Sequence, residues 1–277
     1  MEFINFKLPM SLMVAPPNLG AALGLGKYPR VAFVGSCGKT TALFYLAKEY
    51  PAPVIVTAAS RLETFQTKHV DHHFQFDKTL GWNKAMPTNL SGITLFSGTK
   101  GIRSTAGLEE ETLKEVLSLA DKISTPLFIE ADGSRRHPLK APGTHEPPIP
   151  QFVDTVVVVA GLSALGKPCT SNWVHRPEIY SHLAGLKIGE AISLSAMKKV
   201  ICHPLGGLKN IPSHARKIIL LNQADTQELC EKAEELASSL LPTFDGVVTT
   251  ALNSKMTAPY IANIYNAKTG VKTNPLK

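Results

Sequence analysis

The sequence predicts an α/β fold in which a mostly parallel β-sheet carries helices on both faces. Short apolar segments rich in β-branched residues alternate with segments of helical periodicity along most of the chain. Some of these apolar segments, such as 156–159, are hydrophobic at every position, which is typical of strands covered on both faces. With 277 residues, of which 44% are hydrophobic, the chain is long enough to bury a large core.

The predicted elements follow one another in a regular order. The main strands are predicted at residues 30–34, 53–57, 126–130, 152–160, 217–221 and 246–251. The helices are predicted at residues 39–49, 108–123, 190–200 and 225–241. Weaker strand patterns at 71–76 and 92–96 indicate a hairpin laid on the main sheet.

One α/β domain at residues 29–252 accounts for these elements. It is preceded by a lead-in at 1–28 and followed by a C-terminal extension at 253–277. Residues 133–151, rich in proline, glycine and charge, are predicted to form a long loop inside the domain. Loops of this length in compact domains are usually functional or disordered.

The composition points to a cytoplasmic protein. The four cysteines form no C-x-x-C pair, which argues against a disulfide framework or a zinc site. The N-terminal residues have neither a basic n-region nor an apolar stretch of membrane-spanning length. The net charge of +7 is spread along the chain, so we expect neither nucleic acid nor a membrane as a partner.

The sequence GSCGKTT, which follows the first strand, indicates a phosphate-binding loop. The general pattern G-x-x-x-x-G-K-[ST] needs a glycine where this chain has Phe33, so the loop is shortened to G-x-x-G-K-T, as in the ATP loop of Mur ligases. Glycines let backbone N–H groups turn toward an anion, and the next helix directs its positive dipole end to the same place. We therefore expect a P-loop NTPase-like fold that binds ATP or GTP with Mg²⁺ through Gly35, Ser36, Cys37, Gly38, Lys39, Thr40 and Thr41.

The loop has an alternative interpretation and one unusual residue, Cys37. The alternative to a nucleotide site is a strand-to-helix turn that only imitates one. Cys37 is expected to be a small spacer, although a helix N-terminus and Lys39 would lower the pKa of its thiol.

The segment FIEADG at 128–133 supplies carboxylates at the end of a second apolar strand. Glu130 and Asp132 are two residues apart and so lie on the same side of the chain. We predict that Asp132, ahead of Glu130, holds Mg²⁺ together with Thr40, and that Gly133 brings its N–H group to a phosphate. Lys39, Glu130 and Asp132 are thus candidate catalytic residues. The alternative is an ordinary strand that ends in an Asp-Gly turn.

The segment NQAD at 222–225 is similar to the N-K-x-D pattern with which GTPases bind guanine. Gln223 replaces the lysine of that pattern, while Asn222 and Asp225 are retained as candidate base-binding residues. The alternative is that Asp225, followed by Glu228 three residues later, begins the next helix.

A basic, proline-rich segment, SRRHPLKAPGTHEPPIP, follows the predicted carboxylates at 134–150. Arg135 is predicted to stabilise charge on a transferred group, and Arg136 and Lys140 to bind an anionic second substrate. The alternative is a solvated basic loop.

The middle of the chain resembles the YqeC family. The resemblance rests on EADGSRRHPLKAPGTHEPPIP at 130–150, GLSALGKP at 161–168 and VHRPE at 174–178, flanked by GSCGKTT and NQAD. It implies a P-loop NTPase fold and an NTP-dependent step in maturing the labile selenium cofactor of a selenium-dependent molybdenum hydroxylase. It also implies that such a hydroxylase, or another cofactor-maturation protein, is a partner.

The segments shared with this family contain further candidate residues. His145, Glu146, His175 and Arg176 are candidates for a second-substrate site beside the phosphates, with capping and structural ion pairs as the alternative. The expected function is that of an NTP hydrolase or NTP-dependent transferase. The alternatives are a nucleotide-gated chaperone with little turnover and a Mur-like ligase that activates a carboxylate.

Overall fold

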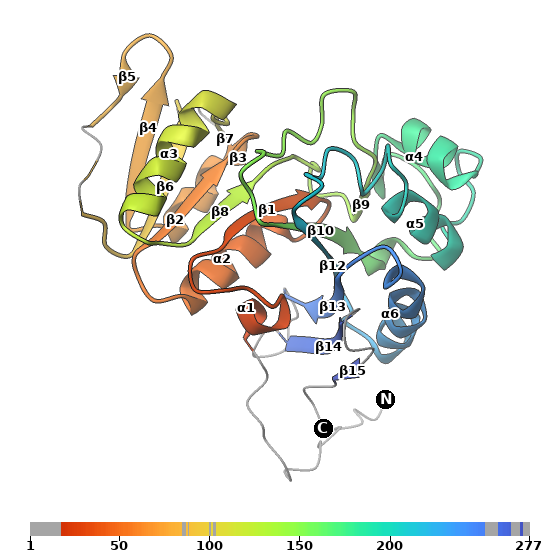
Figure 1. Ribbon diagram of the computed structural model, residues 1–277. Coiled ribbons are helices and arrows are strands. Elements are labelled where there is room, and N and C mark those ends of the chain that lie inside the picture. Colours follow the sequence, from red (N-terminus) through yellow and green to blue (C-terminus); the bar gives the residue numbers. More distant parts are fainter. Residues whose placement is uncertain are drawn as a thin grey trace, which may run out of the picture.

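The computed structural model describes residues 18–84, 87, 89–99, 101, 104–252, 260–266 and 272–273. In this part of the chain, a central 11-stranded sheet has the order β15-β14-β13-β12-β10-β1-β8-β2-β6-β4-β5 (Figure 1). Its strands are β1 (Arg30–Gly35), β2 (Val54–Ala58), β4 (His72–Asp77), β5 (Gly81–Trp82), β6 (Ile93–Gly98), β8 (Leu127–Glu130), β10 (Thr155–Gly161), β12 (Arg216–Asn222), β13 (Gly246–Ala251), β14 (Tyr260–Asn266) and β15 (Lys272–Thr273). All neighbours from β13 to β4 are parallel, which confirms the predicted mostly parallel sheet.

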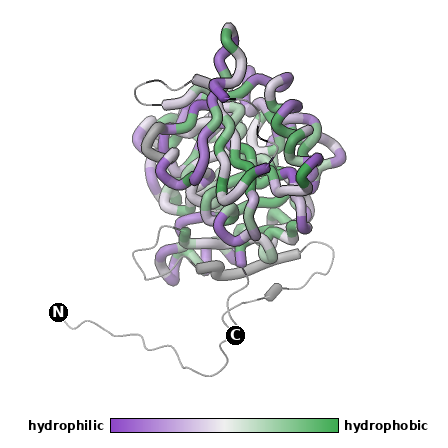
Figure 2. The backbone as a smooth tube through the Cα atoms, turned by 90° about the vertical axis from the view of Figure 1, so that its left-hand side faces the viewer, coloured by the Kyte–Doolittle hydropathy of each residue, from purple (hydrophilic) through white to green (hydrophobic). Residues whose placement is uncertain are grey.

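Helices cover both faces of the sheet. The main helices are α1 (Leu19–Ala22), α2 (Lys39–Glu49), α3 (Glu110–Lys122), α4 (Pro177–Ala184), α5 (Leu194–Ile201) and α6 (Gln227–Leu240). One apolar core holds the buried residues of α1 and α2, and the other holds those of α3, α4, α5 and α6. Apolar segments therefore run through the interior of the molecule, as the hydropathy colours of Figure 2 show.

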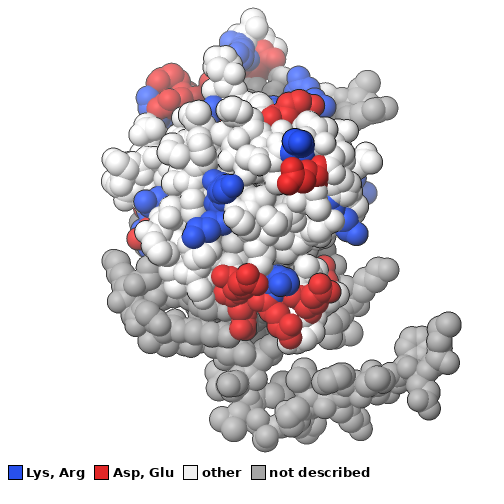
Figure 3. Space-filling view, turned by 90° about the vertical axis from the view of Figure 1, so that its right-hand side faces the viewer, with Lys and Arg blue, Asp and Glu red and all other residues white. Residues whose placement is uncertain are grey.

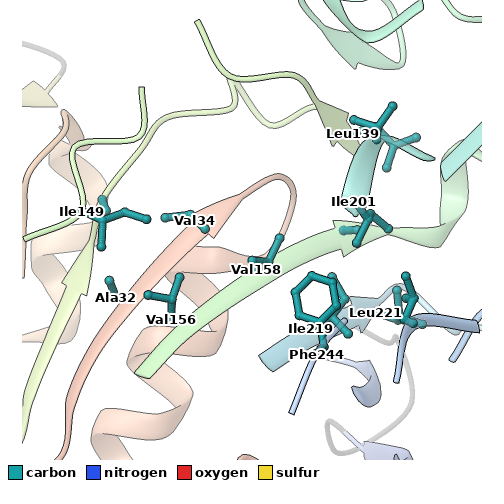
Figure 4. Close-up of a cluster of buried hydrophobic side chains, with 14 of the residues drawn as sticks. Ala32, Val34, Leu139, Ile149, Val156, Val158, Ile201, Ile219, Leu221 and Phe244 are labelled. Carbon is teal, nitrogen blue, oxygen red and sulfur yellow. The ribbon is translucent and has the colours of Figure 1, made fainter. Parts of the chain in front are cut away.

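The strands contribute alternate residues to these two cores, because successive side chains of a strand point to opposite faces. Val31 and Phe33 of β1 face α2, whereas Ala32 and Val34 face the other side. Figure 4 shows Ala32 and Val34 on that second face with their counterparts from β10 and β12, namely Val156, Val158, Ile219 and Leu221. The first strand is thus buried on both faces, as its continuous apolar sequence predicts.

The order of the strands fixes where a ligand can bind. The chain passes from β1 to β2, returns to place β8 between them, and then adds β10 on the other side of β1. In open parallel sheets, ligands bind beyond the carboxyl ends of the strands at the point where the connections diverge. In this sheet that point is the end of β1, where GSCGKTT begins.

Two local predictions are wrong in part or in full, and one helix was not predicted. The expected hairpin of 71–76 and 92–96 is wrong, because β4 and β6 are parallel neighbours and β4 pairs antiparallel with the short strand β5. Helix α4 was not predicted; it begins at Pro177 and ends at Ala184, and Gly185 follows as its cap with φ of +70°, which suits glycine. The predicted helix at 190–200 starts later, at Leu194, because the side chain of Ser193 caps it.

Segments outside the predicted main strands also form paired strands. Within residues 133–151, β9 (Leu139–Lys140) pairs in parallel with β11 (Val174–His175). A further small pair joins β3 (Leu62–Glu63) to β7 (Ser104–Thr105). Strand β14, which lies in the expected C-terminal extension, pairs antiparallel with β13. Among the described residues, no helix combines the length and the apolar character that a membrane span requires.

The core can be tested at Phe128 of β8, which is fully buried and packs edge-on against the ring of Tyr50 with 5.5 Å between centroids. We expect Phe128→Ala to lower the free energy of unfolding by about 3–5 kcal/mol because it leaves a cavity. Urea denaturation measures the change. Leu80→Ala is the control, since Leu80 is 86% exposed and its loss should change stability by less than about 0.5 kcal/mol. A cost at Phe128 no larger than the control's would contradict the packing described here.

Candidate functional site

The connection from β1 to α2 depends on two glycines in left-handed conformations. Gly35 has φ of +96° and Gly38 has φ of +107°. A Cβ atom on Gly35 would lie 2.4 Å from the carbonyl oxygen of Val159, and one on Gly38 would lie 2.1 Å from Nδ2 of Asn222. Only glycine fits these two positions, which explains the spacing G-x-x-G in the sequence.

The backbone N–H groups of the loop fall into two sets. Those of Gly35, Ser36 and Cys37 donate within the protein, to Oδ2 of Asp132 (3.2 Å), the carbonyl of Val159 (2.8 Å) and the carbonyl of His137 (3.1 Å), respectively. The N–H groups of residues 38–41 have no acceptor among the described residues, and no side chain caps α2 at Gly38. The free donors, together with the positive end of the helix dipole, therefore lie at 38–41.

Residues 38–41, which carry these free donors, line a cavity of about 530 Å³. Residues from α2, from the segment after β2 and from the segment after β8 line the cavity: Ser36, Cys37, Gly38, Lys39, Thr40, Thr41, Phe44, Tyr45, Lys48, Arg61, Glu63, His69, Glu130, Gly133, Ser134, Arg135 and Arg136. The lining is rich in lysine and arginine and poor in carboxylates. By contrast, the face in Figure 3 shows scattered Lys and Arg and a group of acidic side chains in its lower part.

A chain of charged side chains runs from the loop to helix α4; it is buried at the loop and partly exposed at Glu146 and Arg176. Nζ of Lys39 lies 2.8 Å from the carbonyl oxygen of Gly35 and 3.3 Å from Oδ1 of Asp132. The other oxygen of Asp132 lies 2.7 Å from Nζ of Lys140, and the same Nζ lies 2.7 Å from a carboxylate oxygen of Glu146. Arg176, which precedes α4, donates two hydrogen bonds to Glu146. The lysines and Asp132 are almost inaccessible to solvent, so each charge needs its neighbour.

This network sets the protonation of Glu146. Burial raises the pKa of Glu146, but hydrogen bonds from Arg176 and Lys140 outweigh the burial and lower the pKa to about 2. Glu146 is therefore ionised at neutral pH. The predicted second-substrate residues Lys140, Glu146 and Arg176 are paired with one another and do not line the cavity described above.

Glu130 and Asp132 have different surroundings although they are two residues apart. The hydroxyl of Thr40 donates a hydrogen bond of 2.5 Å to Oε2 of Glu130. Burial raises the pKa of Glu130, against the opposing effects of Lys39 and Thr40. Asp132 is instead engaged by Lys39, Lys140 and the N–H group of Gly35. The structure thus brings Thr40 to Glu130, and the pairing of Thr40 with Asp132 around Mg²⁺ stays a prediction.

The first residue of the NQAD segment, Asn222, is hydrogen-bonded to the glycine loop. Nδ2 of Asn222 donates to the carbonyl of Cys37 (3.4 Å), and Oδ1 accepts from Thr250 and from the N–H group of Leu252. Asp225 is exposed and does not begin α6, because the side chain of Thr226 caps that helix. The alternative interpretation of Asp225 as a helix start is therefore wrong. Its role in base recognition stays a prediction.

The structure also places Cys37 and the histidines of this region. Burial raises the pKa of the Cys37 thiol, with Lys39 acting in the opposite direction, so the expected lowering of this pKa is wrong. His175 stacks on the ring of His137 with 6.0 Å between centroids, and His145 is exposed. Within the described residues, no group of three or more His, Cys, Asp or Glu side chains is arranged to hold a metal ion.

Sequence reasoning found one side of the cavity and missed the other. Arg135, Arg136 and Gly133 line it as the predicted site would require. Lys48, Arg61 and His69 were not singled out, although all three line it as well. Arg61 follows β2, and β2 pairs with β8, so the two strands end at the same edge of the sheet. That pairing is the signal that would have pointed to Arg61.

The fold and the site define a class of α/β proteins with a glycine loop and a basic cavity at the carboxyl edge of the sheet. The family model for the YqeC protein matches residues 31–178. A protein of Escherichia coli (strain K12) named "Uncharacterized protein YqeC" is 30% identical over 237 residues, which cover 84% of this chain and 90% of that protein. The chain belongs to the YqeC family, as the resemblance predicted. No solved structure matches the chain.

The charge network predicts a pH dependence at His175. Burial, followed by the charges of Arg176 and Lys140, lowers the pKa of His175 from 6.5 to about 4. Between these two values the unfolded chain binds a proton that the folded chain does not, so stability falls as the pH falls through this window. We expect His175→Gln to reduce the fall in unfolding free energy between pH 6.5 and pH 4.5, measured by urea denaturation at each pH.

The control for this measurement is His182→Gln, a substitution at an exposed histidine of α4. It should leave the profile of the unmodified chain in place. If His175→Gln and His182→Gln give the same profile, the neutral state of His175 in the folded chain is refuted.

Proposed function

We propose that this protein binds ATP or GTP with Mg²⁺ at residues 35–41 and turns the nucleotide over. The observation that carries the proposal is the set of free N–H groups at 38–41, at the start of α2 and at the edge of a basic cavity. Backbone donors at a helix N-terminus form a ready site for phosphate oxygens, and neighbouring Lys39 supplies a positive charge. Belonging to the YqeC family supports the same proposal, since its match begins at Val31 and includes this loop.

Lys39 is held in place before any phosphate arrives. Its Nζ contacts carbonyl oxygens of Gly35 and Ser36 and the carboxylate of Asp132. A phosphate oxygen carries more negative charge than a backbone carbonyl and makes a stronger hydrogen bond to the ammonium group. We infer that Lys39 exchanges its carbonyl contacts for phosphate oxygens, while Asp132 keeps its contact with Lys140.

Thr40 and Glu130 offer the oxygen ligands that suit Mg²⁺. A hydroxyl and a carboxylate are hard donors, and Mg²⁺ is bound in proteins by few such groups together with water and phosphate. When bound, Mg²⁺ would neutralise charge on the phosphate oxygens. Glu130 has a second use: burial raises the pKa of its carboxyl group, which makes the carboxylate a better acceptor for the proton of an attacking water. We place Thr40 and Glu130 at the metal, with Asp132 as the residue that positions Lys39.

The biological role that we propose is an accessory step in the maturation of a selenium-dependent molybdenum hydroxylase or its labile selenium cofactor. One observation favours a second candidate, a nucleotide-gated binding protein with little turnover. The buried charges link Lys39, through Asp132, Lys140 and Glu146, to Arg176 at the start of α4. A change at the loop can therefore reach the surface formed by α4 and bias a partner contact there.

Nucleotide binding is tested with Lys39→Ala. We expect the affinity for Mg·ATP or Mg·GTP to fall at least about tenfold, because a charged hydrogen bond to phosphate is lost. Isothermal titration calorimetry measures it. Lys187→Ala, at an exposed lysine of no proposed role, should leave the affinity unchanged. Equal affinity for both variants, or no binding by the unmodified chain, would refute the nucleotide site.

Turnover is tested with Glu130→Gln, which keeps the shape of the side chain and removes its charge. If Glu130 accepts a proton or helps hold Mg²⁺, the rate of phosphate release should fall about a hundredfold or more while nucleotide still binds. Phosphate release under saturating nucleotide is the measurement. Absence of release from the unmodified chain, with tight binding retained, would favour the nucleotide-gated binding protein.

A further inference from the structure

We propose that the part of the cavity lined by Arg61 and Arg135, the arginine end, binds an oxyanion group of a second substrate. The proposal rests on the proposed function, since it assigns the nucleotide phosphates to residues 38–41 and the second substrate to the rest of the same cavity. Neither arginine belongs to the set paired with Glu146.

Several basic side chains of the cavity have no carboxylate partner within the described part of the chain, which supports an anionic ligand. Lys39 is paired with Asp132, and Arg136 is paired with Glu63. Among the residues that the structure describes, Lys48, Arg61 and Arg135 have no ion pair with a carboxylate. Their positive charges face the same cavity, which concentrates anions there. Arginine suits this task because its planar group offers two parallel donors to a phosphate or carboxylate.

Separate elements contribute Lys48, Arg61 and Arg135 to the lining of the cavity. Lys48 lies in the last turn of α2, Arg61 follows the carboxyl end of β2, and Arg135 follows the carboxyl end of β8. Since β2 and β8 are parallel neighbours, the segments after them leave the same edge of the sheet. Residues far apart in the sequence therefore share one cavity with the loop that begins α2.

The backbone at Arg135 is unusual in a way that favours function. Arg135 and Arg136 have φ of +49° and +63°, in the left-handed region that residues with a side chain rarely adopt. Strained residues of this kind persist where surrounding contacts hold them, and they cluster at functional sites. The holding contacts are the ion pair of Arg136 with Glu63, and the hydrogen bond from the N–H group of Cys37 to the carbonyl of His137. The turn that carries Arg135 is thus fixed to the loop and to β3.

The arginine end is separate from the predicted base-recognition segment. Asn222 and Gln223 contact the loop at Cys37, and neither belongs to the described lining of the cavity. A nucleotide whose phosphates lie at 38–41 and whose base lies toward NQAD would leave the arginine end open. A second substrate bound there would share a cavity with the phosphates, which is the proximity that group transfer requires.

The experiment uses inorganic phosphate as the probe and the full chain saturated with Mg²⁺ and β,γ-imido-ATP, so that the phosphate loop is already filled. Equilibrium dialysis with radiolabelled phosphate measures binding. We expect phosphate to bind this complex, and the double variant Arg61→Ala/Arg135→Ala to weaken that binding at least about tenfold while its affinity for β,γ-imido-ATP is unchanged. The charge-matched control is Lys198→Ala/Lys199→Ala, at exposed lysines of α5, which should bind phosphate like the unmodified chain.

A third variant separates ligand binding from a structural role of Arg135. Arg135→Gly removes the guanidinium group and relieves the left-handed strain, so we expect weaker phosphate binding with no fall in Tm. A lower Tm with unchanged phosphate binding would show that Arg135 serves only the fold and would overturn its assignment.

The remaining outcomes distinguish this proposal from the nucleotide site. No phosphate binding to the saturated chain, or a loss of β,γ-imido-ATP affinity in the double variant as large as the loss for phosphate, refutes a separate arginine end. If β,γ-imido-ATP does not bind, the proposed function fails, and phosphate is titrated onto the unliganded chain. In that case, weaker binding by the double variant supports the arginine end, and equal binding refutes it.

Discussion

The buried carboxylate of Asp132 is the group on which the arrangement of the site depends. It lies between Nζ of Lys39 at 3.3 Å and Nζ of Lys140 at 2.7 Å, and it accepts a hydrogen bond from the N–H group of Gly35. Removing one partner of a buried ion pair typically costs about 3–5 kcal/mol, because it leaves an uncompensated charge. Among the described residues, loss of Asp132 would leave the buried ammonium group of Lys39 without a carboxylate, and Lys140 with Glu146 alone. One side chain therefore joins the start of α2 to the long loop.

The position of Asp132 follows from the topology of the sheet. It lies two residues beyond β8, which pairs with β1 on the side opposite β10. The carboxyl ends of parallel neighbours meet at one edge, so the acid after β8 and the loop after β1 are brought together without any local sequence signal. The same edge receives Arg61 from β2. Basic residues scattered through the chain thus gather around one cavity, although the net charge of +7 is modest.

The network also explains why Lys140 and Glu146 of the long loop, and Arg176 before α4, are not free. Lys140, Glu146 and Arg176 look from the sequence like ligands for a second substrate, because they are charged and lie in the block that resembles the YqeC family. In the structure they neutralise one another, and the hydrogen bonds from Arg176 and Lys140 hold the pKa of Glu146 at about 2. Their effect is to fix the loop against β11 and α4. Arg135, in contrast to these three residues, has no carboxylate partner among the described residues.

The sequence by itself determined the strands and helices with strong periodicity, the glycine loop and the family. The helix at 39–49 and the strand at 246–251 have the predicted bounds, because continuous apolar runs and the Gly-Lys-Thr turn are local signals. Tertiary structure alone decided the pairing of β4 with β6 and the division of N–H groups into occupied ones at 35–37 and free ones at 38–41. It also decided that Thr40 meets Glu130 whereas Asp132 meets two lysines. These outcomes depend on which strands become neighbours and which buried charges find partners, and such long-range contacts leave no local pattern in the sequence.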